Sequence, residues 1–128
     1  MSVYQTKGFG RFARKAKLEV SELLEAAAAV ASGDWDADLG GGVFKQRIAR
    51  RGSGKSGGFR TILLFKVGSH TFFVVGFAKN ERASLTDREL RALKKLAAAY
   101  LAADLTMVEA LVDAGEIEEL RDDGEGGS

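Results

Sequence analysis

Apolar residues in the first third of the chain recur at helical spacing. The first group, at intervals of three and four residues, is Phe9, Phe12, Ala13 and Ala16. This stripe predicts a short helix over about residues 8–16, because side chains at these intervals share one face of a helix. A longer stripe predicts a second helix over residues 20–31, and Gly33 follows it where helices commonly stop. The two segments together predict a helical hairpin.

In the centre of the chain the apolar pattern changes to alternation, which is typical of strands. Residues 43–49 alternate, so that Lys45 and Arg47 share the face opposite to the apolar side chains. Two longer apolar strands are predicted over residues 59–67 and 70–79. The two-residue link between them begins with glycine, which indicates a tight hairpin.

Two further helices are predicted after these strands. Thr86 and Glu89 have the spacing of a capping box, in which each side chain bonds to the other residue's backbone at a helix start. The second of these helices is short, begins near Leu105 and ends at Gly115. A brief and highly charged edge strand is predicted over residues 116–120.

This order of elements predicts an α+β fold with two N-terminal helices, a mainly antiparallel sheet of about four strands, and C-terminal helices. We expect the helices to cover one face of the sheet and a basic groove to occupy the other. Residues 1–121 are expected to form a single domain, and residues 122–128 a disordered acidic tail. The acidic and then glycine-rich residues 34–42 predict a loop that leads into the first strand.

Charge is divided unevenly along the chain. Residues 1–103 hold eighteen Lys and Arg against nine Asp and Glu, whereas residues 104–128 hold one against nine. Between residues 43 and 82 only Glu81 opposes the cations Lys45, Arg47, Arg50, Arg51, Lys55, Arg60, Lys66, Lys79 and Arg82. Such a segment attracts polyanions. The alternatives are a solvated surface that maintains solubility and strand-end cations that pair with the acidic C-terminal segment.

Several chemistries do not fit this composition. The chain has no cysteine and one histidine, His70, which lies beside the predicted hairpin turn without a nucleophile to serve. No carboxylate pair or cluster with metal-ligand spacing falls in the basic segment, so two-metal hydrolysis is not indicated and no cofactor is implied. Any catalysis would therefore rest on cations. RNA permits this, because its own 2′-hydroxyl can attack the adjacent phosphorus.

The chain lacks a signal-peptide pattern and any apolar run long enough to span a membrane, so we expect a cytoplasmic protein without a membrane partner.

Three short motifs resemble a known family when they are taken in order. They are Val43-Phe-Lys-Gln-Arg47, Gly58-Phe-Arg60 and Phe72-Phe-Val-Val-Gly-Phe-Ala-Lys79-Asn-Glu-Arg82. Together with the predicted layout, they resemble the RelE/ParE-like toxins of bacterial type II toxin–antitoxin systems, over roughly residues 7–103. The resemblance implies a microbial-ribonuclease-type fold, a cognate antitoxin, and inhibition of translation and growth by cleavage of mRNA, often on the ribosome.

By this resemblance the catalytic residues are Lys45, Arg47, Arg60 and Arg82. Arg60 would stabilise charge on the phosphorane, Lys45 or Arg47 would bind phosphate and assist deprotonation of the 2′-hydroxyl, and Arg82 would stabilise the departing 5′-oxygen. The substrate backbone would be held by Arg50, Arg51, Lys55, Lys79 and Asn80.

Two positions depart from the best-known branch of that family. Asn80 stands where it has a second catalytic arginine, and Thr86 where it has a tyrosine. Two alternatives therefore stay open: a ParE-like inhibitor of DNA gyrase without nuclease activity, and a nucleic-acid-binding adaptor without catalysis. The acidic segment after Asp104 also suggests that it folds against the basic face and shields it from polyanions.

Overall fold

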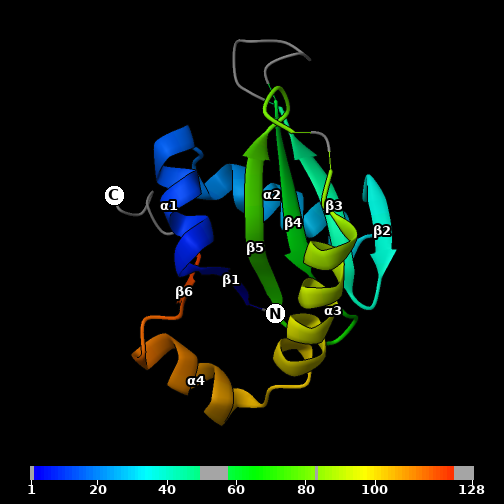
Figure 1. Ribbon diagram of the computed structural model, residues 1–128. Coiled ribbons are helices and arrows are strands. Elements are labelled where there is room, and N and C mark those ends of the chain that lie inside the picture. The colour runs from blue at the N-terminus through cyan, green and yellow to red at the C-terminus, as the bar shows by residue number, and fades with distance from the viewer. Residues whose placement is uncertain (1, 50–57, 83, 123–128) are drawn as a thin grey trace.

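A computed structural model describes residues 2–49, 58–82 and 84–122, in which one mixed sheet is flanked by helices (Figure 1). Its strands are β1 (Val3–Thr6), β2 (Ala37–Gly40), β3 (Val43–Ile48), β4 (Phe59–Leu64), β5 (Thr71–Ala78) and β6 (Ile117–Glu119). Its helices are α1 (Lys7–Ala16), α2 (Val20–Ala31), α3 (Asp87–Leu101) and α4 (Leu105–Asp113). The predicted α+β class and the predicted helices are confirmed.

The described sheet has six strands in the order β2-β3-β4-β5-β1-β6. Neighbouring strands are antiparallel except for β1, which runs parallel to β5. The expectation of a mainly antiparallel sheet therefore holds, with two more strands than the sequence predicts. Val74 is the extra residue of a bulge in β5, because Ile62 pairs with Val75 while Leu63 pairs with Phe73.

The two strands that the sequence pattern missed are four residues long each. The first, β1, is fixed by backbone bonds to both neighbours, since Ser2 O accepts from the N–H of Thr71 and Val3 O accepts from the N–H of Leu120. The second, β2, lies in the segment predicted as a loop and turns back into β3 through glycines with positive φ angles. Strands this short offer too few positions for alternation to be recognised.

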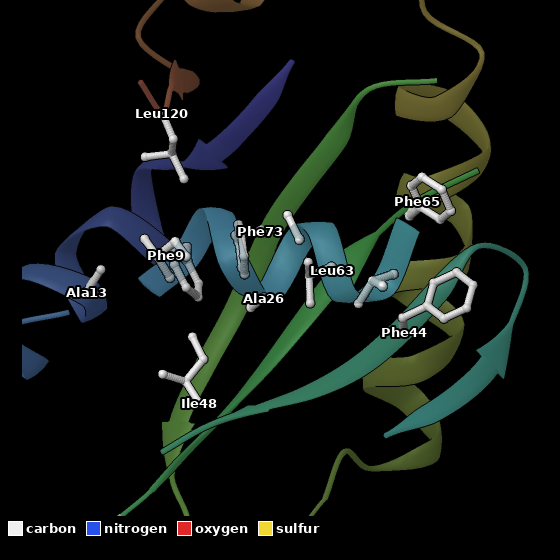
Figure 2. Packing of buried hydrophobic residues seen from close by; sticks show 12 residues of the cluster. Phe9, Ala13, Ala26, Phe44, Ile48, Leu63, Phe65, Phe73 and Leu120 are labelled. Atoms are coloured by element: carbon white, nitrogen blue, oxygen red, sulfur yellow. The ribbon is translucent and has the colours of Figure 1, made fainter. Parts of the chain in front are cut away.

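Helices α1 and α2 pack on one face of the sheet, where Phe9, Leu23 and Val30 are buried against strand residues such as Leu63 and Phe73. Figure 2 shows this cluster around α2 and the central strands, with Ala13 on one side and Phe44 and Phe65 on the other. The apolar stripe that predicted each helix from the sequence is thus the face that the helix buries against the sheet.

Helices α3 and α4 pack on the opposite face, around Ile62, Leu64 and Phe72. Ala97 from α3 and Val108 from α4 are buried in this second cluster. The expectation that helices cover one face only is therefore wrong. The physical reason lies in β4, whose neighbouring residues Ile62 and Leu63 are both fully buried, so that each face needs an apolar cover.

The cover on the second face is partial. Figure 1 shows α3 crossing the sheet over the lower part of β3 and β4, while the upper part of these strands, towards the end of β5, extends beyond the helix. The start of α3 is fixed by the predicted capping box, in which Thr86 and Glu89 bond reciprocally. None of the described helices is both long and apolar enough to cross a bilayer.

Gly76 in β5 provides a test of the packing of α1. A Cβ atom at this position would lie 2.2 Å from the ring of Phe12, which forms an edge-to-face pair with Phe59. Gly76→Ala is expected to displace that ring and to lower the free energy of unfolding by about 1–3 kcal/mol in urea titrations. A second substitution, Phe12→Leu, should restore part of the loss. Unchanged stability of Gly76→Ala would show that α1 does not pack here as described.

Candidate nucleic-acid interface

The uncovered end of the second face carries the cations that the sequence singled out. The alternation of β3 turns Phe44 and Ile48 into the cluster beneath α2, so that Lys45 and Arg47 share the other face with Val43, which is buried beneath α3. Arg60 lies on the same face because it is the direct partner of Arg47 in the β3–β4 register. The predicted shared face is therefore present.

Arg60 is the central residue of this arrangement. Its cross-strand neighbours are Arg47 on β3 and Phe77 on β5. Lys45, also on β3, is the partner of Ile62 and is therefore a diagonal neighbour of Arg60. Directly opposed side chains have Cβ atoms about 4.5–5.5 Å apart, and like charges in such pairs are destabilising. Two arginines facing each other thus place concentrated positive charge between two strands.

One nitrogen of Arg60 has no bonding partner in the described part of the chain. The Nη1 atom is buried, yet no described acceptor lies within hydrogen-bond reach of it. A buried donor on a charged group destabilises a protein unless an acceptor binds it. An anion that bound the guanidinium group on this face would reduce the repulsion between Arg60 and Arg47.

Arg82 reaches the same area from the segment between β5 and α3. Its guanidinium lies over the ring of Phe77, with Cζ 5.0 Å from the ring centroid. The group also donates to Glu89 and to the carbonyl of Ser84. Because Phe77 is the register partner of Arg60, Arg82 and Arg60 border the same ring from two sides.

Two carboxylates partly compensate these cations. The bond from Arg82 holds the pKa of Glu89 at about 2, below its usual 4.5, and the same bond raises the pKa of Arg82. Asp36 accepts from the backbone N–H of Arg47 at 2.6 Å and lies 3.9 Å from its Nε. Neither of these two carboxylate partners was predicted from the sequence. The capping box placed Glu89 near the chain reversal, whereas nothing in the pattern marked Asp36.

The remaining predicted binding residues fall into two groups. Lys79 and Asn80 are exposed in the turn after β5, at the end of the sheet where Phe59 pairs with Ala78, and so lie near Arg60 along the strand. The others, Arg50, Arg51 and Lys55, lie outside the described residues.

The described part of the acidic segment lies away from the cationic face. Its strand β6 pairs with β1 and is separated from β4 by two strands. Helix α4 contributes Val108 to the same apolar cluster as Ile117 of β6. Glu118 accepts from Gln5 and Glu119 from Arg121. Residues 104–122 therefore do not shield Arg60, and residues 123–128 lie outside the described residues.

The comparison with known families agrees with this fold. The family described as "RelE toxin of RelE / RelB toxin-antitoxin system" matches residues 1–120. The chain belongs to this RelE toxin family and is thus a toxin of a toxin–antitoxin system, for which the family implies a cognate antitoxin partner. A search of curated proteins found no significant match. In the described residues, no three acidic or histidine side chains gather as metal ligands would.

The Arg82–Glu89 pair makes stability depend on acid pH. A folded pKa near 2 against an ordinary 4.5 means that ionised Glu89 stabilises the fold above pH 4.5, and that this stabilisation disappears as the pH falls towards 2. At pH 6, Glu89→Gln should have a lower Tm than the wild type. Between pH 6 and pH 2.5, the Tm of Glu89→Gln should fall by less than the Tm of the wild type. Glu109→Gln on α4 is the matched control and should titrate like the wild type. Equal Tm losses in wild type and Glu89→Gln would contradict this role.

Proposed function

We propose that this toxin is an endoribonuclease that cleaves mRNA at the face formed by Lys45, Arg47, Arg60 and Arg82, without a metal ion. The observation that carries the proposal is the buried, unbonded Nη1 of Arg60 between a second arginine and an aromatic ring. An open basic face bordered by a ring suits a polymer whose phosphates and bases alternate.

Cleavage would use the substrate's own 2′-hydroxyl. Its oxygen attacks the adjacent phosphorus, the bond to the 5′-oxygen breaks, and the products are a 2′,3′-cyclic phosphate and a 5′-hydroxyl. Negative charge grows on the non-bridging oxygens of the phosphorane, where a preorganised guanidinium stabilises the transition state more than the ground state. We assign this role to Arg60 because it lies between Arg47 and Phe77 in the strand register and its Nη1 donates to no acceptor in the described part of the chain.

Lys45 and Arg47 would act on the nucleophile's side. Lys45 is half-buried, and Arg47 keeps 47% of its side chain exposed, so that both remain open to a strand lying across β3. We assign phosphate binding to Arg47 and assistance in removing the 2′-proton to Lys45. The proton finally passes to solvent. Glu89 is unsuited to this step, because a pKa of about 2 makes it a weak base at neutral pH.

Arg82 would stabilise the departing 5′-oxygen from its position over Phe77. Its raised pKa keeps it a cation, so it stabilises charge and the leaving oxygen takes its proton from water. Its bond with Glu89 competes with this use, and RNA must share or replace that partner. The cognate antitoxin would neutralise the same face, and carboxylates on an amphipathic helix suit that task.

The test is induced expression with mapping of transcript ends in vivo. The wild type should arrest growth and produce new 5′ ends, whereas Arg60→Ala should lower cleavage by roughly 10²–10³-fold, the usual effect of removing one transition-state donor. Arg121→Ala, at the far edge beside β6, removes the same charge and should behave like the wild type. Full toxicity of Arg60→Ala would refute the proposed site.

The same experiment distinguishes the rival functions, which the departures at Asn80 and Thr86 keep open. Growth arrest with intact transcripts and inhibited DNA supercoiling would identify a gyrase inhibitor. RNA binding without arrest or cleavage would identify an adaptor.

A further inference from the structure

Helix α1 carries a second cationic surface, on the face of the helix that is turned away from the core. Its members, which we call the α1 stripe, are Lys7, Arg11, Arg14 and Lys15. They are spaced i, i+4, i+7 and i+8, so they form one band along the helix, and all four are exposed. The helix contains no acidic residue. Among the described residues, no carboxylate comes within ion-pair distance of the stripe.

The stripe has the dimensions of a backbone-binding surface. From Lys7 to Lys15 the helix rises roughly 12 Å at 1.5 Å per residue. Neighbouring phosphates of one strand are about 3.4 Å apart along the axis of a duplex and farther apart in an extended single strand, so the stripe is long enough to contact about two or three phosphates of a single strand. Four mobile cations along such a length suit a chain of phosphates better than a single compact anion.

A pocket joins the stripe to the end of the sheet where Arg82 lies. It has a volume of about 400 Å³ and is lined by Arg11 and Lys15 of α1, by the rings of Phe12 and Phe59, and by Glu81. Phe59 is buried and Phe12 is half-buried, so the two rings form an apolar wall of the pocket, and Glu81 can accept from a base's amino group although it repels phosphate. Ala78, the last residue of β5, also lines the pocket. The stripe therefore meets, around the end of this strand, the face formed by Lys45, Arg47, Arg60 and Arg82, which we call the Arg60 face.

We infer that the α1 stripe binds the phosphate backbone of single-stranded RNA, as a contact separate from the Arg60 face. An RNA segment that leaves the Arg60 face would pass the end of β5 and continue along α1, on the other side of the sheet. This inference extends the proposed RNA binding and does not depend on cleavage. A membrane surface is the less suitable partner, because Phe9 and Ala13, which an interfacial helix would insert into lipid, are buried in the core.

The test measures binding of a 12-nucleotide RNA whose 2′-hydroxyls are all methylated, so that cleavage cannot occur. The α1 variant is Arg11→Gln, Arg14→Gln and Lys15→Gln. The control variant removes the same charge from exposed positions on α3, by Arg88→Gln, Arg91→Gln and Lys95→Gln. Affinity is measured by fluorescence anisotropy between 50 and 200 mM salt, about the range over which phosphate contacts dominate. Circular dichroism verifies that both variants are folded.

The slope of log affinity against log salt should fall by about 2 in the α1 variant, since each contact to single-stranded nucleic acid contributes about 0.7. Affinity at 50 mM salt should fall at least about tenfold, and the control should change the slope by less than half as much. An unchanged α1 variant, or equal changes in both variants, would overturn the inference. Binding to vesicles of anionic phospholipid that the α1 variant loses, with RNA affinity intact, would overturn it too.

Failure of the nuclease proposal would give a different result. In that case the wild type would bind methylated RNA through α1 yet would leave unmodified RNA intact. The opposite outcome is that the wild type cleaves RNA and the α1 variant has the wild-type KM for both a trinucleotide and a 12-nucleotide RNA. The nuclease proposal would then stand, and only the inference about the α1 stripe would fail.

Discussion

The register between β3, β4 and β5 is the constraint on which the site depends. It places Arg47 opposite Arg60 and Arg60 opposite Phe77, on the face where Ile62 and Leu64 anchor α3. A slip of one residue would turn every side chain of a strand to the other face, which would bury arginine beneath α2 and expose the apolar residues. Burial of the two apolar clusters therefore fixes the position of the cations. The free energy gained from this burial also offsets the repulsion between Arg47 and Arg60.

This arrangement leaves the cationic face only partly compensated. Arg47 and Arg82 each have a carboxylate partner, whereas one nitrogen of Arg60 has none in the described part of the chain. Both carboxylate pairs are well exposed, so a phosphate can compete with them at little cost in stability. The face is thus stable without a bound anion, and an anion that binds it would stabilise it further, which is the thermodynamic condition for a binding site.

Much of this organisation was predictable from local patterns. Helical spacing predicted α2, the capping box predicted the start of α3, and alternation placed Lys45 and Arg47 on one face. Elements that form through pairing with distant parts of the chain were not predictable. Strand β1 is one of them, because it is defined by its hydrogen bonds to β5 and β6. Asp36 reaches Arg47 only after β2 folds back beside β3. Helices on the second face were not predicted, although the continuous apolar run of β4 is typical of a strand that is covered on both faces.

The central claim is that this cationic face cleaves RNA through the substrate's own 2′-hydroxyl. The most direct measurement is end-group analysis of RNA incubated with the purified toxin in excess chelator, with and without translating ribosomes. Cleavage by the 2′-hydroxyl should produce 2′,3′-cyclic phosphate and 5′-hydroxyl ends, and a substrate with a single 2′-deoxy nucleotide at the cleaved position should be resistant. Ends bearing a 5′-phosphate, or cleavage of the deoxy substrate at the same position, would contradict it.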